Sequence, residues 1–192
     1  MKQTDTKTQI LDVAQELIQR VGVNGMSYQD ISERVGIRKA SIHTHFPKKD
    51  DLLAALLDRY NGRFLRVVDG IWDSGDSPEG KLRRYCGLFT ATLGSGDGDK
   101  ACLCAMLGAE LASLNHPSIE RVRGFYEANE ERLERLLESG RQDGSFRFAG
   151  ETRAMASLIF GSLEGGMLVA RVQRGAPQLH ETIEQLVRLV KG

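Results

Sequence analysis

The stretch SYQDISERVGIRKASIHTHFPKKDD (residues 27–51) carries the strongest structural signal in this chain. Ser27 followed three residues later by Asp30 is a capping-box pattern, which predicts that a helix begins here. Gly36 ends that helix, and a second short helix is expected from about Arg38 to His45 because a proline follows it. Two short helices joined by a turn that contains Gly indicate a helix-turn-helix, whose second helix enters the major groove of DNA.

The same stretch is locally basic. From residue 34 to residue 49 it contains five Lys or Arg, two His and no Asp or Glu, whereas the whole chain of 192 residues has 26 basic and 26 acidic residues and no formal net charge. A basic surface on a neutral chain favours the phosphates of a nucleic acid as its partner. The alternative is an ordinary solvated basic hairpin in an all-helical protein.

Residues on both sides of this stretch extend the pattern. A preceding helix is expected to carry its apolar residues on one face and to end at a glycine: Ile10, Leu11, Ala14, Leu17, Ile18, Val21, then Gly22. The whole block resembles the DNA-binding domain of the TetR family of transcriptional regulators. The resemblance covers Ile10-Leu11-Asp12-Val13-Ala14, Gly22, Asp30-Ile31, Val35-Gly36-Ile37, Ala40-Ser41-Ile42, His45-Phe46 and Lys49-Asp50-Asp51-Leu52.

The chain departs from the family pattern at two positions. His43 stands where the family usually has a Tyr that holds a DNA phosphate, so the resemblance implies a phosphate contact from His43, stronger when the imidazole is protonated. Lys48 stands where a small polar residue usually caps the next helix, and Lys cannot accept a hydrogen bond from helix N–H groups. We therefore expect that cap to be lost or replaced, and Lys48 to offer a phosphate contact instead.

The candidate DNA-contacting residues lie on or beside the second helix and at the start of the first. Base edges are expected to be reached from some of Arg38, Lys39, Ser41 and Thr44, with His45 beside them, and phosphates from Ser27, Tyr28, His43, Lys48 and Lys49.

The remainder of the chain has helical periodicity to its end. Helices are expected over 50–72, 82–94, 102–114, 119–141, 151–174 and 177–190, with a turn at His116-Pro117 and a loop at 94–100. We predict an all-α protein of about nine helices, with a DNA-binding domain at 1–48 and an effector-binding and dimerisation domain at 49–192. No apolar run reaches about 18 residues and the start MKQTDTKTQ is polar, so a cytoplasmic location is expected.

The last two predicted helices carry the argument for assembly. Three glycines in the first of them (Gly161, Gly165 and Gly166) each cost about 1 kcal/mol of helix propensity relative to Ala, and close approach of another helix is the usual compensation. Two helices per chain, paired with those of a symmetry mate, would form a homodimer, which the resemblance also implies. The candidate interface residues are Leu158, Gly161, Gly165, Gly166, Ile183 and Val187. The alternative is that both apolar stripes close the core of one chain.

Large apolar side chains are concentrated in the predicted body and suggest an effector cavity. The candidates are Tyr60, Phe64, Trp72, Tyr85, Phe89, Cys102, Met106, Glu110, Phe125 and Tyr126. An ordinary core is lined in the same way, and remains the alternative for each of them. Glu110 and Glu164 interrupt apolar helix faces. Each is expected either to be a flanking charge with a route to solvent or to select a cationic ligand.

Cys102 has a second interpretation. It follows Lys100 at the expected start of a helix, and both a cation and a helix N-terminus lower the pKa of a thiol. Some regulators that resemble this chain have a Cys in such a position and respond to electrophiles or oxidants. The alternative is a small packed side chain.

The sequence offers no enzyme signature. It has no phosphate-binding glycine loop of known type and no His-Glu-x-x-His, and its four His, at 43, 45, 116 and 180, suggest no metal cluster, so neither a cofactor nor a metal is expected. The prediction is a homodimeric regulator that binds a near-palindromic DNA operator and is released by a small apolar or aromatic effector. The alternatives are a thiol-sensing repressor using Cys102, a helical thiol-dependent or small-molecule enzyme, and a helical protein-interaction module without DNA binding.

Overall fold

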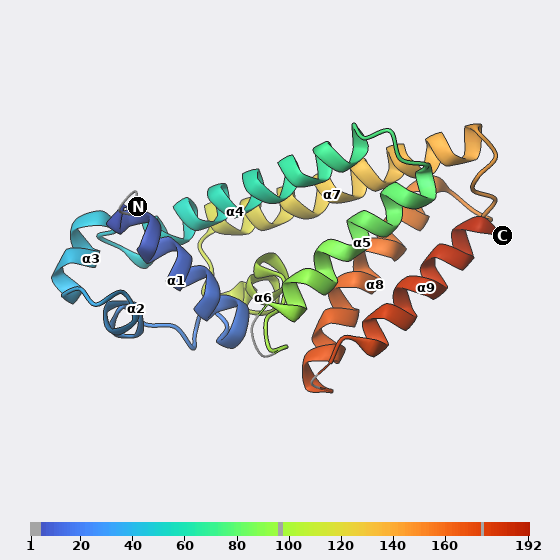
Figure 1. Ribbon diagram of the computed structural model, residues 1–192. Helices are drawn as coiled ribbons and strands as arrows, with labels where there is room; N and C mark the ends of the chain where they lie inside the picture. Colours follow the sequence, from blue (N-terminus) through green and yellow to red (C-terminus); the bar gives the residue numbers. More distant parts are fainter. Residues whose placement is uncertain (1–4, 96–97, 174) are drawn as a thin grey trace. The chain divides into compact units, whose positions relative to one another are not determined.

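The computed structural model describes residues 5–95, 98–173 and 175–192. In these residues the regular secondary structure is entirely helical, with nine α-helices and one 3-10 helix (Figure 1). They are α1 (Thr6–Val21), α2 (Tyr28–Val35), α3 (Lys39–His45), α4 (Lys49–Trp72), α5 (Pro78–Gly94), α6 (Leu103–Ala109), η1 (Leu111–Ser113), α7 (His116–Gln142), α8 (Thr152–Val172) and α9 (Pro177–Lys191). The all-α class and the nine helices predicted from the sequence are confirmed.

The described residues form two compact units. The first contains the chain up to Gly62 together with Leu103–Gly124, and the second contains Arg63–Cys102 together with Phe125–Gly192. The long helices α4 and α7 each contribute to both units. The predicted functional division at residue 48 is a different boundary and stays a prediction.

The helix-turn-helix forms in the first unit as its local signals require. At the start of α2 the Ser27 N–H donates to the Asp30 carboxylate at 2.8 Å, and the Asp30 N–H donates to the Ser27 hydroxyl at 3.3 Å, which completes the capping box. Gly36 ends α2 with a left-handed backbone, φ 75°. Ile31 of α2 and Ile42 of α3 are fully buried, and α2 packs against both α1 and α3.

The helix α4 begins at Lys49 with a cap that the sequence pattern did not specify. The Asp51 carboxylate accepts a hydrogen bond from the Lys48 backbone N–H at 3.0 Å, and Asp50 and Asp51 both lie in the first turn. Negative charge is favourable at a helix N-terminus. The small polar cap of the family is therefore replaced from within the helix.

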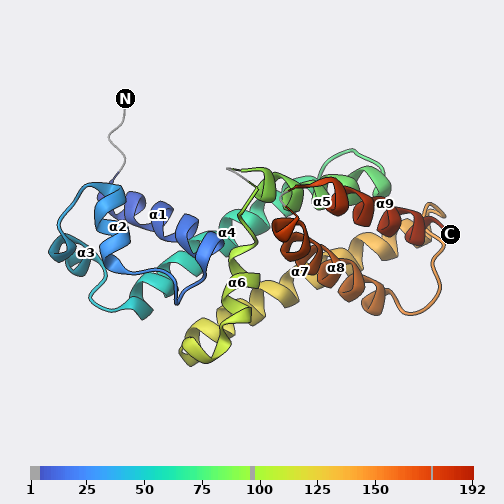
Figure 2. The same ribbon diagram turned by 90° about the horizontal axis from the view of Figure 1, so that it is seen from below.

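The second unit is built around α8, which packs most extensively against α9 and also against α5. The chain reverses between α8 and α9, and the two helices lie side by side in both views (Figures 1 and 2). The buried face of α9 is wholly apolar, from Leu179 to Val190. On another side of the unit, α4 is tied to α7 because the Arg132 guanidinium pairs with the Asp69 carboxylate at 2.7 Å.

Two predicted boundaries are wrong. The helix expected over 102–114 is divided, since α6 ends at Ala109, Glu110 is non-helical, and η1 follows. The turn expected at His116-Pro117 is instead the first turn of α7, where a missing proline N–H costs nothing because that group has no partner within the helix. The loop expected at 94–100 lies partly outside the described residues.

Candidate DNA-binding and effector sites

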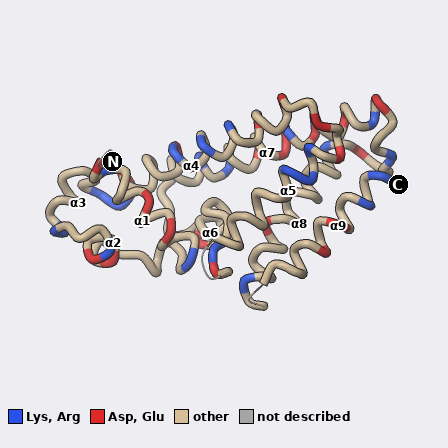
Figure 3. Tube along the Cα trace, in the orientation of Figure 1, with Lys and Arg blue, Asp and Glu red and all other residues tan. Residues whose placement is uncertain are grey.

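The surface of α3 is polar and carries no acidic residue. Ile42 points into the core and fixes the helix, while Lys39, His43, Thr44 and His45 are exposed. Arg38 and Ser41, the other two base-edge candidates, are exposed and half-buried respectively. Figure 3 marks Lys and Arg around α3 and no Asp or Glu on the helix itself. The base-edge candidates therefore lie on α3 or, for Arg38, directly before it, and the buried Ile42 anchors this short helix to the core.

Tyr28 and His43 form a pair beside α3. The Tyr28 ring lies 4.9 Å from the His43 ring, and its hydroxyl donates to the Phe46 carbonyl at 3.0 Å. Burial, with the nearby Asp51 and Asp50 carboxylates, raises the pKa of Tyr28 to about 12, so the hydroxyl stays a donor. Because that donor is already used, Tyr28 supports His43 here, and its predicted phosphate contact stays a prediction.

Lys49 and Ser27 also have structural partners. The Lys49 ammonium donates to the Val23 carbonyl at 2.6 Å and to the Met26 carbonyl at 3.1 Å, which ties the start of α4 to the turn between α1 and α2. The Ser27 hydroxyl is engaged in its capping box. Their phosphate contacts stay predictions, and the exposed Lys48 is the clearer phosphate candidate.

One basic residue was missed from the sequence. The Lys7 ammonium lies 5.6 Å from the centre of the Phe46 ring, and Phe46 is the residue that ends α3. Lys7 is far from the helix-turn-helix in sequence and belongs to no motif. Only the packing of α1 places this cation beside α3.

We expect Lys48→Ala to weaken binding to all DNA sequences alike. Loss of one phosphate contact should reduce the slope of log affinity against log salt concentration by about 0.9. Gel shifts at several salt concentrations measure this slope, with Arg66→Ala, an exposed cation in the second unit, as the control. A changed sequence preference with an unchanged slope would place Lys48 at a base instead.

Six of the effector candidates form one aromatic cluster in the second unit. Phe64 lies 5.2 Å from Phe125 and 6.0 Å from Phe89, measured between ring centres. The cluster is Phe64, Trp72, Tyr85, Phe89, Phe125, Tyr126 and Phe160, joined by ring contacts of 5.2–6.4 Å. Phe160 was not among the ten candidates. Tyr60, Met106 and Glu110 lie in the first unit.

The buried polar groups described beside this cluster form hydrogen bonds, except for the carboxyl group of Glu164. The Tyr85 hydroxyl, fully buried, donates to the Asn129 side-chain oxygen at 3.0 Å, and the Asn129 amide donates to the Phe125 carbonyl at 2.8 Å. Burial raises the pKa of Tyr85 well above 10, and the nearby Glu164 raises it further. Glu164 itself is the exception.

Glu164 is buried on α8 without a normal hydrogen-bond partner. Its residue exposure is 8%, and neither carboxyl oxygen has a partner of ordinary hydrogen-bond geometry among the described residues. Burial raises its pKa well above the ordinary 4.5, and the Cys102 thiol beside it acts in the same direction. The expectation of a flanking charge with a solvent route is therefore wrong for Glu164.

The raised pKa of Glu164 predicts a dependence of stability on pH. The folded state holds a proton that the unfolded chain releases above about pH 4.5, so the free energy of unfolding should fall as pH rises from there toward the folded pKa. Glu164→Gln removes this titration and should flatten the curve. Urea unfolding at a series of pH values compares the two proteins, and equal slopes would mean that the Glu164 pKa is ordinary.

Cys102 is not the exposed thiol that its sequence position suggests. It lies just before α6 and is only 3% exposed, and Cys86 and Cys104 are fully buried. Burial raises the pKa of Cys86 to about 12. Cys102 therefore stands at the helix start expected from the sequence, but its side chain is buried rather than exposed.

We expect maleimide to modify none of the three cysteines rapidly in the native protein. A buried thiol has a small thiolate fraction and no access to reagent. Mass spectrometry after short labelling, with and without urea, gives the order of reaction. Fast native labelling of Cys102 that also releases DNA would restore the thiol-sensing alternative.

The predicted interface residues divide into two groups. Leu158 is 48% exposed, and Gly161 and Gly165 are exposed with no other described atom within 4 Å of an added Cβ. Ile183 and Val187 are buried in the core of their own chain, and their role in an interface stays a prediction. Gly166 faces its own α9, since an added Cβ would lie 3.0 Å from Leu179 Cδ1.

The outward face of α8 is itself apolar. Its exposed large side chains are Leu158, Leu168, Val169 and Val172, with Leu189 on α9. By length and composition this helix could cross a membrane, but the core helix of a soluble protein meets the same criterion. Of its most apolar stretch, 44% is buried within the chain and the rest is not. A helix with one face in its own core and another free is what an interface between two copies requires.

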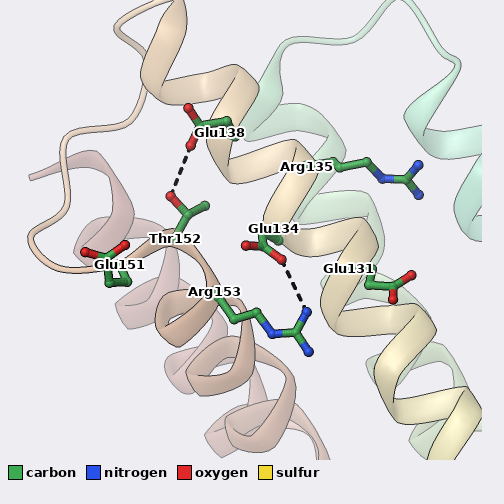
Figure 4. A pocket seen from close by; sticks show the side chains of 7 residues that line it. All are labelled: Glu131, Glu134, Arg135, Glu138, Glu151, Thr152 and Arg153. Atoms are coloured by element: carbon green, nitrogen blue, oxygen red, sulfur yellow. Dashed lines mark hydrogen bonds and ion pairs between the residues drawn. The ribbon is translucent and has the colours of Figure 1, made fainter.

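A polar groove between α7 and α8 does not have the character of an effector site. Figure 4 shows Arg153 directed to Glu134 and Thr152 directed to Glu138, at 3.4 and 3.1 Å. The groove is lined by Glu131, Glu134, Arg135, Glu138, Glu151, Thr152 and Arg153. Arg153 and Glu134 pair with each other there, and the lining is predominantly acidic. Among the described residues no group of three His, Cys, Asp or Glu is placed to hold a metal.

A helix-turn-helix on a small helical head, continued by a helical body, defines a DNA-binding transcriptional regulator. The chain matches the family model "Bacterial regulatory proteins, tetR family" over residues 10–56 and "Tetracyclin repressor-like, C-terminal domain" over residues 78–186. The chain belongs to the TetR family. It is a ligand-responsive DNA-binding repressor and not an enzyme.

Individual relatives agree with this assignment. A TetR-family regulator from Agrobacterium tumefaciens is 31% identical, with 97% of each chain covered and a TM-score of 0.92. A TetR regulator from Legionella pneumophila is 29% identical, with all of both chains covered and a TM-score of 0.89. The HTH-type transcriptional repressor NemR of Escherichia coli is 23% identical over 97% of this chain and 94% of its own.

Proposed function

We propose that this protein is a homodimeric cytoplasmic repressor that binds a near-palindromic operator through α3 and leaves it when a small aromatic or apolar effector binds the second unit. The observation that carries the DNA-binding part is the surface of α3. Its buried Ile42 fixes the helix, and Lys39 and Thr44 face solvent with no acid on the helix. A rigid helix with exposed donors is what base readout in the major groove needs.

The exposed face of α8 supports the dimer. Gly161 and Gly165 leave room for a second helix, and Leu158 and Val169 supply apolar area around them. One helix-turn-helix reads only a half-site, so two heads related by a two-fold axis would read a palindrome.

The contact of Glu110 supports a route from effector to DNA. Its carboxylate accepts hydrogen bonds from the backbone N–H groups of Val23 and Asn24, at the turn between α1 and α2. Asn24 in turn donates to the Ser113 hydroxyl at 2.8 Å. The segment α6–η1 therefore holds the helix-turn-helix head, and it follows directly in the chain from Cys102. A shift of α6 caused by an effector would reach the head through these bonds.

Selection of bound fragments from random DNA tests the proposal. The wild-type protein should enrich a site with two-fold symmetry. The variant Lys39→Ala/Ser41→Ala/Thr44→Ala should stay helical, because these side chains are exposed or half-buried, and should lose the enrichment. Equal, weak binding of all sequences by both proteins would contradict operator recognition by α3.

A further inference from the structure

Beside the aromatic cluster lies one buried carboxyl group, that of Glu164, whose described neighbours offer no hydrogen bond of ordinary geometry and only the Cys102 thiol nearby. Glu164 reaches the cluster from α8, next to Phe160 and Leu163 on the same helix, and its two oxygens lack ordinary partners among the described residues. An unmatched buried polar group costs free energy comparable to a lost hydrogen bond or more. Such a group is retained at a cost to stability, which suggests that a ligand completes it.

We propose that Glu164 anchors a binding site for an organic cation whose apolar part lies among the aromatic rings of the cluster. This inference rests on the proposed effector role of the second unit and names the chemical class of the effector. Its ammonium or ring cation would pair with the Glu164 carboxylate, and Phe89 and Phe160 would contribute their faces.

The groups around Glu164 explain why a cation fits. Cys102 lies beside it, and α5 adds the hydroxyl of Tyr85, which is neutral. The buried residues of α9 are all apolar, and the carboxylate of Glu130 on α7 adds negative charge near Tyr85. The pKa of Glu164 is raised by burial and by Cys102, and no Lys or Arg is among its causes.

Binding would exchange a proton for the ligand. Without a cation, burial favours the neutral acid form of Glu164, since taking an unpaired carboxylate out of water is costly. A permanent cation would favour the ionised form, so the proton leaves to solvent as the ligand enters. A neutral ligand with a carbonyl would instead accept a hydrogen bond from the acid and release no proton. The two ligand classes differ in the sign of their pH dependence.

Entry of the ligand would also rearrange the cluster. Phe89 and Phe160 lie 6.4 Å apart between ring centres, and Tyr126 lies 5.4 Å from Phe160, both in edge-on contact. A flat ring inserted between such partners separates α5 from α8. Separation of these helices is the change of shape that a ligand-responsive protein needs.

The test compares cations with neutral molecules of the same shape. Full-length protein is titrated calorimetrically with 1-methylquinolinium and 1-methylnaphthalene, and with benzyltrimethylammonium and neopentylbenzene. We expect the wild type to prefer the cation of a pair at least about tenfold, which is about 1.4 kcal/mol, with affinity rising with pH and one proton released. Glu164→Gln should remove the preference, and Glu164→Asp should retain part of it. The control Glu134→Gln removes a carboxylate on α7 that pairs with Arg153 in the polar groove, outside the cluster, and should change nothing.

Three results would overturn the proposal. They are a cation preference that survives Glu164→Gln, a preference for the neutral member of each pair, and no binding of any of these cations to the wild type. Gel shifts with the same proteins distinguish failure of the cation site from failure of the proposed function. Failure of the wild type to bind an operator in the absence of any ligand would contradict the proposed function, whereas operator binding without a cation site would contradict only this inference.

Discussion

Gly165→Leu is expected to convert the dimer into a folded monomer that no longer holds its operator. Gly165 is exposed on α8, and no other described atom lies within 4 Å of the Cβ that the substitution adds. Within one chain the change should be tolerated, because Leu has a helix propensity about 1 kcal/mol better than Gly. Across the proposed interface it inserts a branched side chain where two helices approach.

The expected loss is large because the interface is symmetric. Overpacking costs about 1–3 kcal/mol at one site, and a two-fold axis repeats it, giving about 2–6 kcal/mol of dimer free energy. Sedimentation velocity would show the monomer, and circular dichroism would show unchanged helix content. Operator affinity should fall steeply since a single head contacts one half-site.

Two other glycines provide matched comparisons. Gly70→Leu places the same side chain at an exposed position of α4, with no described neighbour within 4 Å, and should leave the dimer intact. Gly166→Leu should instead destabilise the chain itself, because its Cβ would lie 3.0 Å from Leu179 of α9. The sequence predicted the same effect for Gly165 and Gly166. A dimeric Gly165→Leu protein would move the interface away from this face.

The helix-turn-helix could be predicted because its signals are local. The Ser27–Asp30 capping box and the left-handed Gly36 act within a few residues, so a sequence pattern specifies them. The end of α6 could not be predicted. Glu110 leaves the helix while its carboxylate binds the N–H groups of Val23 and Asn24, 86 and 87 residues earlier in the chain.

The candidate sites were predicted less well for the same reason. Lys49 stands in a basic run, but its ammonium is used by carbonyls 23 and 26 residues away. The helix that carries Glu164 is apolar on two faces, so its periodicity does not tell whether Glu164 faces solvent or the core. The packing of the folded chain buries it. The periodicity of α9 likewise places Ile183 and Val187 on one apolar face. It does not tell whether that face packs against the same chain or against a second copy.

Gly22→Ala is expected to cost about 2–4 kcal/mol of unfolding free energy, a large loss for so small a change. Gly22 has φ 77° and ψ 174°, a backbone conformation that is essentially restricted to glycine. An added Cβ would also lie 2.6 Å from a carboxylate oxygen of Glu110. Urea unfolding at a fixed protein concentration measures the loss, since dimer stability depends on concentration.

Gly36→Ala separates the two causes. Gly36 also has a positive φ, 75°, but no described neighbour lies within 4 Å of an added Cβ. Gly36→Ala should therefore lower the unfolding free energy only by the strain of a left-handed alanine, about 1 kcal/mol. The double variant Gly22→Ala/Glu110→Ala should recover the steric part of the Gly22→Ala loss, leaving a coupling of about 1 kcal/mol between the two sites. Additive effects would mean that Glu110 does not press on Gly22.

The same contact makes Glu110 a test of signalling. Glu110→Gln keeps the shape of the side chain but replaces a charged acceptor of the Val23 and Asn24 N–H groups with a neutral one, and charge-assisted hydrogen bonds are about twice as strong. We expect operator binding without effector to change little, and the factor by which an effector weakens it to shrink. Linkage requires that operator DNA then weaken effector binding by the same smaller factor, which calorimetry with and without DNA measures independently. An unchanged factor in both measurements would place the coupling in α4, which continues from the head into the second unit without passing through Glu110.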